Sequence, residues 1–342
     1  MEELGGWPAV LGPLTQRVDL SAETAKAAMT EILSDAATSA QIAGFIVALR
    51  MKGETVDELV GLLDALAEAG ERVELSALDG VIDIVGTGGD RSHSVNVSTM
   101  SALVIAGAGV RVCKHGNRAA SSRCGAADLL EALGVRLELD PAAVARCVDD
   151  AGIGFCFAPR FHPAMRHAVP TRRELGVPTV FNVLGPMSNP ARVRRQVLGV
   201  ADPAMAEKMA RVLAARGLER VLGVHGDDGL DELTTTTTST VVELVDGEVA
   251  RSTVDPRELG LALVEPGALV GGDASKNAAV ARAVLAGDAG APRDVVLLNA
   301  ASGLLVAGAV DDLAAGVARA AESIDSGAAA GALDRLVAAS NA

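Results

Sequence analysis

Hydrophobic positions recur at helical spacing through the first 70 residues of the chain. Three helices are predicted there, over residues 22–34, 39–52 and 56–70. Ser21 and Ser39 are candidate N-caps of the first two, and Thr55 with Glu58 has the spacing of a capping box for the third. We therefore expect a small helical domain over residues 1–75.

From residue 81 onward the pattern changes to short Val, Ile and Leu runs that alternate with Ala-rich helical stretches. Strands are predicted over residues 81–85, 111–114, 196–200, 220–224, 241–244 and 294–298, and helices over residues 99–107 and 122–133. The threonine run 234–238 is interpreted as strand, because Thr is β-branched and the run leads into valines. This alternation is typical of an α/β fold with a central, mainly parallel sheet, which we expect over residues 76–342.

Composition narrows the class of protein. The 342 residues are 49% hydrophobic, yet no apolar run reaches the ~18 residues that a membrane span needs. The start at Met1 lacks a signal-peptide pattern, so we expect a cytoplasmic protein. The four cysteines show no C-x-x-C spacing and are expected to be reduced and mostly buried.

The charge is distributed unevenly along the chain. The net charge is −14, but residues 111–195 hold 13 Lys and Arg against 7 Asp and Glu, which leaves +6 there and −20 elsewhere. A globally acidic protein is a poor match for nucleic acid, whose phosphate backbone favours a broad basic face. A small anionic ligand in a local positive pocket fits this distribution better.

Three short motifs contain candidate ligand-binding residues, one inside the basic stretch 111–195 and two outside it. The first, residues 83–90, is an apolar strand that runs into a glycine-rich turn, where backbone amides can approach a phosphate. The second, residues 114–118, places a cation, an imidazole and an amide together. The third offers the adjacent carboxylates of Asp231 and Glu232, which suit Mg²⁺. Together they are typical of a phosphoribosyl-transfer site.

Each candidate also has a purely structural interpretation. Asp231 and Glu232 could form a solvated acidic turn, and His115 could be a core histidine bonded to backbone. Ser121 and Ser122 could simply cap the following helix, although a capped helix start also binds phosphate well. Four of the five phenylalanines cluster at 155, 157, 161 and 181, near Arg172 and Arg173, and are either an aromatic wall for a ring or ordinary core.

The motifs resemble those of the anthranilate phosphoribosyltransferases of tryptophan biosynthesis over nearly the whole chain. Six motifs in order carry the resemblance: Gly86-Thr87-Gly88-Gly89-Asp90, Asn96-Val97-Ser98-Thr99, Lys114 to Ser122, Phe157 to Pro163, Asp231-Glu232-Leu233-Thr234 and Gly271 to Ala274. A single glycine-rich motif would be weak evidence, whereas six in family order are specific.

The resemblance implies a site for 5-phosphoribosyl 1-pyrophosphate (PRPP), anthranilate and magnesium. PRPP would be bound by Gly86, Gly89, Asp90, Ser94, Asn96, Val97, Ser98, Thr99, Lys114, His115, Gly116, Asn117, Arg118, Ala119, Ala120, Ser121, Ser122 and Ala126. Anthranilate would contact Gly86, Asn117 and Arg172, and two Mg²⁺ ions per protomer would be held by Ser98, Asp231 and Glu232. No enzymic nucleophile is implied, and Lys114, His115 and Asn117 would position the substrates.

The resemblance also implies an architecture. The family combines a small helical domain, to which residues 165–190 would contribute, with a larger α/β domain of the nucleoside phosphorylase type, and it forms homodimers through the helical part. Three positions depart from the family pattern: Arg91 replaces a frequent Gly, Ser94 a usual Thr, and Ala126 a common Ser. These three departures bear on individual contacts to the ligand and not on the reaction that the resemblance implies.

Two other functions remain open at this point. A nucleoside phosphorylase-like enzyme would also have a glycine-rich phosphate loop, but the Asp-Glu pair and residues 114–117 argue against it. A non-catalytic ligand-binding paralogue is the other alternative, since a fold does not secure a function. The acceptor could also be a substituted relative of anthranilate.

Overall fold

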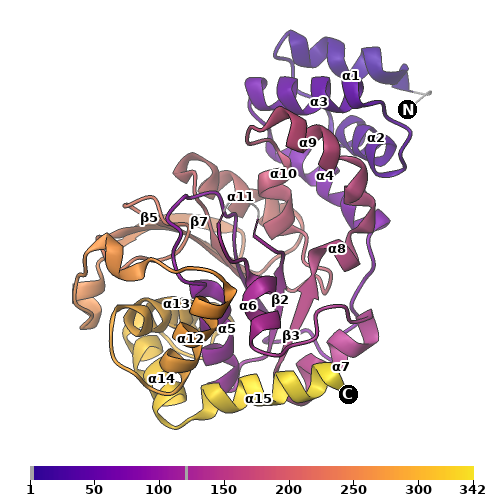
Figure 1. Cartoon of the computed structure of the whole chain (residues 1–342). Coiled ribbons are helices and arrows are strands. Elements are labelled where there is room, and N and C mark those ends of the chain that lie inside the picture. The colour runs from indigo at the N-terminus through magenta and orange to yellow at the C-terminus, as the bar shows by residue number, and fades with distance from the viewer. Residues whose placement is uncertain (1–3, 120–121) are drawn as a thin grey trace.

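The computed structural model describes residues 4–119 and 122–342. A bundle of N-terminal helices stands at one end of the molecule, and a sheet flanked by helices forms the rest (Figure 1). The chain ends in a helix on the far side of the sheet from the bundle (Figure 1). These two parts have the architecture expected from the sequence, a small helical unit and a larger α/β unit, while the division at residue 75 stays a prediction.

The bundle contains α1 (Gly6–Thr15), α2 (Ala22–Leu33), α3 (Ser39–Lys52) and α4 (Val56–Ala69). Ser21 caps α2, and the Thr55–Glu58 capping box of α4 is present. The predicted cap of α3 is wrong, because Thr38 rather than Ser39 accepts the bond from Gln41 N. Gln41 bonds back to Thr38, so the capping box fixes the helix start one residue earlier. Helix α1 has no counterpart among the predicted helices.

The sheet has seven strands in the order β3-β2-β1-β4-β5-β6-β7. The first five run parallel, and the last two are antiparallel. Five of the six predicted strands are confirmed, with boundaries shifted by one or two residues. The strands are β1 (Ile82–Gly86), β2 (Val112–Gly116), β3 (Ile153–Phe157), β4 (Arg195–Gly199), β5 (Arg220–Gly226), β6 (Ser239–Val245) and β7 (Glu248–Val254).

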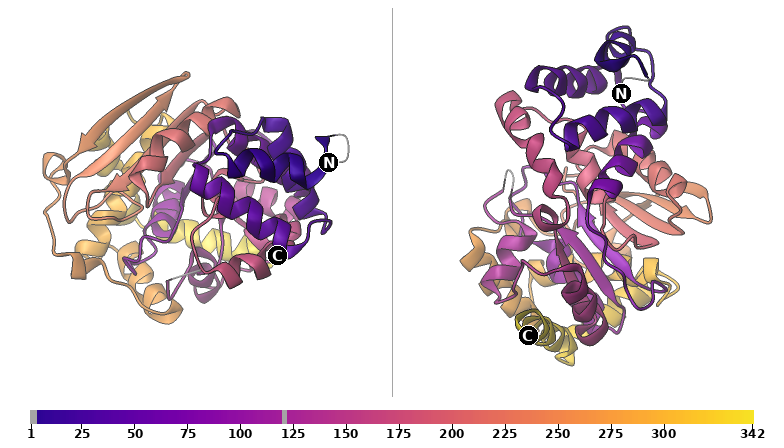
Figure 2. Two further views of the ribbon diagram at one scale, coloured as in Figure 1. Left: turned by 90° about the horizontal axis from the view of Figure 1, so that it is seen from above. Right: turned by 90° about the vertical axis from the view of Figure 1, so that its right-hand side faces the viewer.

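Helices cover both faces of this sheet (Figure 2). Neighbouring residues on a strand point to opposite faces, so Val197 and Leu198 of β4 belong to two different cores. The core on the Val197 side includes side chains of α5 (Val97–Gly107), α6 (Ala126–Ala132), α7 (Pro141–Ala151), α12 (Ala274–Leu285), α13 (Ala291–Ala307), α14 (Leu313–Asp325) and α15 (Ala328–Asn341). The core on the Leu198 side is shared by α1 to α4, α10 (Phe181–Leu184) and α11 (Pro203–Ala215).

Two strand predictions are wrong. Residues 294–298 lie inside α13, because a buried helix and a buried strand show the same continuous apolar run. The threonine run is not strand, and β6 begins only at Ser239. Hydroxyls of Thr234 and Thr236 donate to Asp228 instead, a local bonding pattern that competes with a sheet ladder.

Two further expectations concern side-chain burial. The four clustered phenylalanines are all core, with Phe161 fully buried, so the structural interpretation is the correct one. All four cysteines are free and buried, as predicted. In the part of the chain that the structure describes, no helix combines the length and the apolar character that crossing a membrane requires.

Short helices connect the sheet to the bundle. After β3 come α8 (Ala158–Phe161), a 3₁₀ turn (Pro163–His167), α9 (Val169–Leu175) and α10. Helices α9 and α10 lie beside the N-terminal bundle, and α9 contacts α3 (Figure 1). The carboxyl ends of the parallel strands face this connecting region, and crevices at such ends bind ligands in open α/β sheets.

Candidate active site

The glycine-rich loop follows β1 directly. Thr87 N donates to the carbonyl of Gly199 at 2.9 Å, and Gly88 and Gly89 adopt positive φ angles of 67° and 82°. A Cβ at position 86 would overlap with the Asp231 carboxylate, so only glycine fits there. The loop therefore exposes backbone amides next to an acidic side chain from a distant part of the sequence.

Asp231 and Glu232 lie at the carboxyl end of the sheet, and both are buried. Asp231 Oδ2 accepts from Gly88 N at 2.6 Å, and Glu232 Oε1 accepts from Ser98 N at 3.1 Å. Burial, with the negative charge of Asp90 next, raises the pKa of Asp231 to about 7. Burial and then the charge of Asp231 raise the pKa of Glu232 to about 8. The solvated-turn interpretation therefore does not fit this pair.

A buried cation lies among these acids. Lys114 Nζ donates to Ile84 O at 2.5 Å and to Ser98 Oγ at 3.3 Å. Burial lowers the pKa of Lys114, while the charges of Asp83, Glu232 and Asp231 oppose that shift. Carboxylate and hydroxyl oxygens are the donors that Mg²⁺ prefers, and it usually adds substrate phosphates to one or two carboxylates. The residues present therefore fit a magnesium ion that also takes phosphate oxygens, although among residues 4–119 and 122–342 no three His, Cys, Asp or Glu side chains are arranged to hold a metal ion by themselves.

The first turn of α5 lies next to the acidic pair, because Ser98 N donates to Glu232 Oε1. Asn96 is the N-cap residue, but its side chain makes no capping bond. Its Nδ2 donates to Cys124 O at 3.0 Å, and its Oδ1 accepts from Asn277 at 2.8 Å. Two amides of this first turn already have acceptors: Val97 N bonds to Val95 O at 2.7 Å and Ser98 N to Glu232 Oε1 at 3.1 Å. An anion bound at this helix start would therefore take the place of the Glu232 carboxylate on Ser98 N. Thr99 Oγ1 is buried without a partner in the described structure.

Residues 114–116 are the last residues of β2, and residues 117–119 continue the chain into a loop. Arg118 is paired with Asp128 and Glu131, at 3.0 and 2.8 Å. Asn117 is exposed, and its Oδ1 accepts from Arg118 N at 2.7 Å. The predicted cap at Ser122 is wrong, because α6 begins after Gly125. Among the predicted PRPP residues, Ala120 and Ser121 lie outside the described residues.

The three departures from the family pattern have distinct surroundings. Arg91 has a φ of 59°, a left-handed conformation that a glycine would adopt without strain. Ser94 N donates to Ser92 Oγ at 3.2 Å. Ala126 is the first residue of α6 and is partly buried. The backbone at position 91 explains why a glycine would suit it.

His115 is buried beside a second histidine. Its Nδ1 lies 3.1 Å from Gly185 O, and because a carbonyl only accepts, Nδ1 carries the proton. Nε2 is buried without a partner in the described structure, and the ring meets His162 edge-on with centroids 5.4 Å apart. Burial, and then the charge of His162, lower the pKa of His115 to about 3. His115 is therefore neutral at physiological pH.

This depressed pKa predicts a pH dependence of stability. The unfolded state takes up a proton below about pH 6.5 but the folded state does so only near pH 3, so stability is retained above pH 6.5 and lost as pH falls through that window. Between pH 7 and 5 the loss attributable to His115 should be about 2 kcal/mol. Urea unfolding of wild type and His115→Asn at both pH values measures it. Equal pH dependence in both proteins would contradict the buried neutral imidazole.

Arg172 on α9 is the cation proposed for the acceptor. Its guanidinium carbon lies 5.0 Å from the ring centroid of Phe181, and burial lowers its pKa. It has no acidic partner within 4 Å among the described residues. Arg173, one position on, is exposed. Among the described residues, no hydrogen bond joins the Arg172 side chain to the glycine-rich loop or to the start of α5.

Two residues that sequence reasoning missed organise the loops. Asp128 accepts from Ala119 N and Gly125 N at 2.9 and 2.8 Å, and so folds the loop after β2 onto α6. Asn277 accepts from Gly272 N at 2.7 Å and holds Asn96. Asp128, three residues after the N-cap Gly125, makes only half of a capping box, because glycine has no side chain to accept from the helix, so the sequence signal was weak. Asn277 has no local signal beyond following the motif of residues 271–274.

The chain matches two family models that divide it in the same order as the structure. Residues 8–70 match "Glycosyl transferase family, helical bundle domain", and residues 78–330 match "Glycosyl transferase family, a/b domain". Together these matches cover most of the chain.

Curated and solved relatives agree on one activity. The chain is 57% identical to the anthranilate phosphoribosyltransferase of Rhodococcus jostii (strain RHA1) over 335 residues, which are 96% of this chain and 92% of that protein. The crystal structure of the Thermus thermophilus enzyme superposes with a TM-score of 0.91 at 42% identity, covering 97% of this chain and 99% of that one. The Saccharomyces cerevisiae enzyme in complex with PRPP and Mg also gives 0.91, at 28% identity and 98% coverage of both chains. The chain belongs to the anthranilate phosphoribosyltransferase family.

Proposed function

We propose that this chain transfers the 5-phosphoribosyl group of PRPP to the amine of anthranilate, giving N-(5-phosphoribosyl)anthranilate and pyrophosphate in tryptophan biosynthesis. The observation that carries the proposal is the buried Asp231–Glu232 pair, bonded to the amides of Gly88 and Ser98 with Lys114 beside it. A glycosyl transferase needs these elements to hold a pyrophosphate and a metal ion together. The same pair distinguishes the chain from an enzyme that uses only inorganic phosphate.

PRPP is proposed to bind where the glycine-rich loop, the first turn of α5 and the end of β2 converge. Backbone amides of these elements bind phosphate oxygens without requiring a side chain. The proposed ligands are Gly86, Gly89, Asp90, Ser94, Asn96 to Thr99, Lys114 to Ser122 and Ala126. Of these side chains, Arg118 is already paired with two acids, so its backbone is the better candidate.

Two magnesium ions per protomer are proposed, held by Ser98, Asp231 and Glu232 with the phosphates of PRPP. When bound, Mg²⁺ neutralises charge on the pyrophosphate leaving group. The raised pKa values of both acids support this assignment, because a buried carboxylate pair with one lysine is short of positive charge.

The chain's own side chains then orient the reactants. The C1–oxygen bond to pyrophosphate breaks as the anthranilate nitrogen bonds to C1, and positive charge develops on the sugar as in other glycosyl transfers. The nitrogen then releases one proton to the solvent, and pyrophosphate leaves with the bonding electron pair. No enzymic nucleophile is needed. Lys114 is fixed by Ile84 O near the leaving group, and Arg172 is proposed to hold the anthranilate carboxylate. Asn117, exposed at the end of β2, is proposed to contact the acceptor together with Gly86.

A fluorescence assay tests this function directly. Anthranilate fluorescence should fall with time when purified protein, PRPP and Mg²⁺ are all present, and EDTA should stop the loss. Substituted anthranilates in the same assay identify the preferred acceptor. No loss of anthranilate or of any substituted analogue would refute the proposed function.

A homodimer formed through the N-terminal helices is also proposed. Much of their apolar surface is covered within the chain by α10 and α11, but Val47 and Ala48 of α3 are only half-buried, and Met51 and Val18 are exposed. Such surface favours association with a second copy. Light scattering at micromolar concentration should give twice the mass of the chain, and a monomer would contradict the proposal. The cytoplasmic location stays a prediction.

A further inference from the structure

Asp83 is a fully buried carboxylate that the proposed chemistry does not use. It lies on β1, and both of its oxygens are occupied. Oδ1 accepts from His115 N of β2 at 3.1 Å, and Oδ2 accepts from Asn189 Nδ2 at 2.8 Å. Asn189 Nδ2 also donates to Cys113 O at 2.8 Å. Asp83 therefore connects the middle of the sheet to residues 185–190, which we call the 185–190 segment.

Side chains from three strands and from His162, which follows α8, hold this segment. Besides Asp83, they act on three of its carbonyl groups. His115 Nδ1 bonds to Gly185 O at 3.1 Å, Gln196 Nε2 donates to Pro186 O at 2.7 Å, and His162 Nε2 lies 2.9 Å from Ser188 O. Gly185–Met187 form a short 3₁₀ turn, with Ser188 N bonded to Gly185 O at 3.1 Å, and these polar side chains fix where that turn lies against the sheet.

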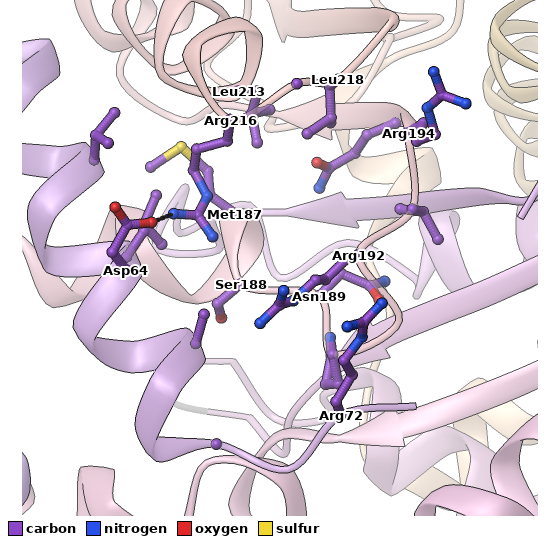
Figure 3. A pocket seen from close by; sticks show the side chains of 18 of the residues that line it. Asp64, Arg72, Met187, Ser188, Asn189, Arg192, Arg194, Leu213, Arg216 and Leu218 are labelled. Carbon is purple, nitrogen blue, oxygen red and sulfur yellow. Dashed lines mark hydrogen bonds and ion pairs between the residues drawn. The ribbon is translucent and has the colours of Figure 1, made fainter. Parts of the chain in front are cut away.

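Packing supports only part of the segment: Met187 is buried in the core shared with the N-terminal helices, whereas Ser188 and Asn189 are half-buried. Residues 187–190 line a cavity of about 520 Å³ that also borders the ends of α4 and α11 (Figure 3). An ion pair between Asp64 of α4 and Arg216 after α11 crosses the same space (Figure 3). Side chains that line such a cavity have fewer packing contacts than those in a closed core. The hydrogen bonds therefore add to the packing of Met187 in fixing the position of the segment.

The segment leads directly to the proposed acceptor site. Helix α10 ends at Leu184, one residue before the segment, and begins with Phe181, over which the Arg172 guanidinium stacks. A shift of the segment moves α10 and with it the ring that supports Arg172. A displacement of about 1 Å in such a support can reduce catalysis by as much as ~100-fold.

We propose that Asp83 is a positioning residue for the acceptor: by holding Asn189 it fixes the 185–190 segment, and through that segment Phe181 and Arg172. The inference rests on the proposed function, because it takes Arg172 to be the anthranilate-binding cation. A carboxylate is required because its two oxygens face two donors, His115 N and Asn189 Nδ2. Asparagine has the same size but would turn an NH₂ group toward one of them.

A double-mutant cycle between Asp83 and Asn189 tests the proposal. Asp83→Asn and Asn189→Ala should each raise KM for anthranilate about tenfold, the effect of leaving one buried donor unpaired. In Asn189→Ala the KM for PRPP should change less than about twofold, whereas Asp83→Asn also removes a negative charge beside Lys114, so the PRPP comparison is made on Asn189→Ala. The double variant should be no worse than the more affected single variant, because both residues act through one bond. Ser101→Ala, which removes a buried bond to Val296 O elsewhere, is the control for destabilisation without displacement of the segment.

Three results would contradict the proposed role of Asp83. Lower thermal stability with unchanged KM values, additive effects on the anthranilate KM, or an effect confined to the PRPP KM would overturn the proposal. If Asp83→Asn does not fold, Asn189→Ala alone must still raise the anthranilate KM. A wild type without transfer activity would refute the proposed function, and in that case fluorescence titration of anthranilate binding to the same variants still tests the inference.

Discussion

Replacing Asp231 by Asn and Glu232 by Gln together is expected to lower kcat at least ~100-fold, the typical cost of losing one stabiliser of transition-state charge. The amide oxygens can still accept from Gly88 N and Ser98 N, so the local geometry should survive. Burial disfavours the charged form of both acids, and neutral side chains should therefore leave thermal stability unchanged or higher. Steady-state kinetics at saturating substrates and magnesium, with a thermal melt of each protein, measure both effects.

The same acidic loop supplies a control for this double variant. Asp227 is exposed and bonds to Thr238 and Thr240 rather than to the glycine-rich loop. Asp227→Asn should leave kcat within about twofold of wild type, as for surface substitutions away from a site. Near-wild-type turnover in the Asp231 and Glu232 double variant, or an equal loss in the control, would remove the metal assignment.

Local patterns predicted the framework of the site. The strand and glycine turn at residues 82–90 fold as the spacing indicates, and they bring Gly88 to Asp231, although 143 residues separate the two in sequence. The order of the six motifs along the chain indicated that these residues belong to one site. No single motif was sufficient, because each one also had a structural interpretation of its own. The capping box that starts at Thr38 could also have been found, since Gln41 three residues later completes it.

Other features depend on tertiary contacts that no short window contains. Residues 294–298 look like a strand because helix α13 is buried for most of its length. The bond between Asp83 and Asn189 joins positions 106 apart, and neither residue has a local pattern that indicates the other. The clustered phenylalanines suggested an aromatic wall, but three of them pack into the sheet core and only Phe181 supports Arg172. Sequence patterns therefore predicted the contacts of the glycine-rich loop better than the surroundings of Arg172.

Arg172→Ala is expected to raise KM for anthranilate by roughly 10- to 100-fold with little change for PRPP. A guanidinium binds a carboxylate through two parallel hydrogen bonds, which lysine does not reproduce in geometry. Losing one partner of a desolvated charge pair costs about 2–5 kcal/mol, and the partial burial of Arg172 argues for the lower end. About 1.4 kcal/mol corresponds to a factor of ten.

Two features make this variant a clean test. Arg172 has no acidic partner within 4 Å among the described residues, so its removal leaves no buried acid unpaired and should cost little stability. Arg173 is exposed one position along the same short helix, about 100° away around its axis, and Arg173→Ala is the matched control. Initial rates over a range of each substrate separate the two KM values. A larger effect in Arg173→Ala, or a loss confined to PRPP binding, would show that the acceptor carboxylate binds elsewhere.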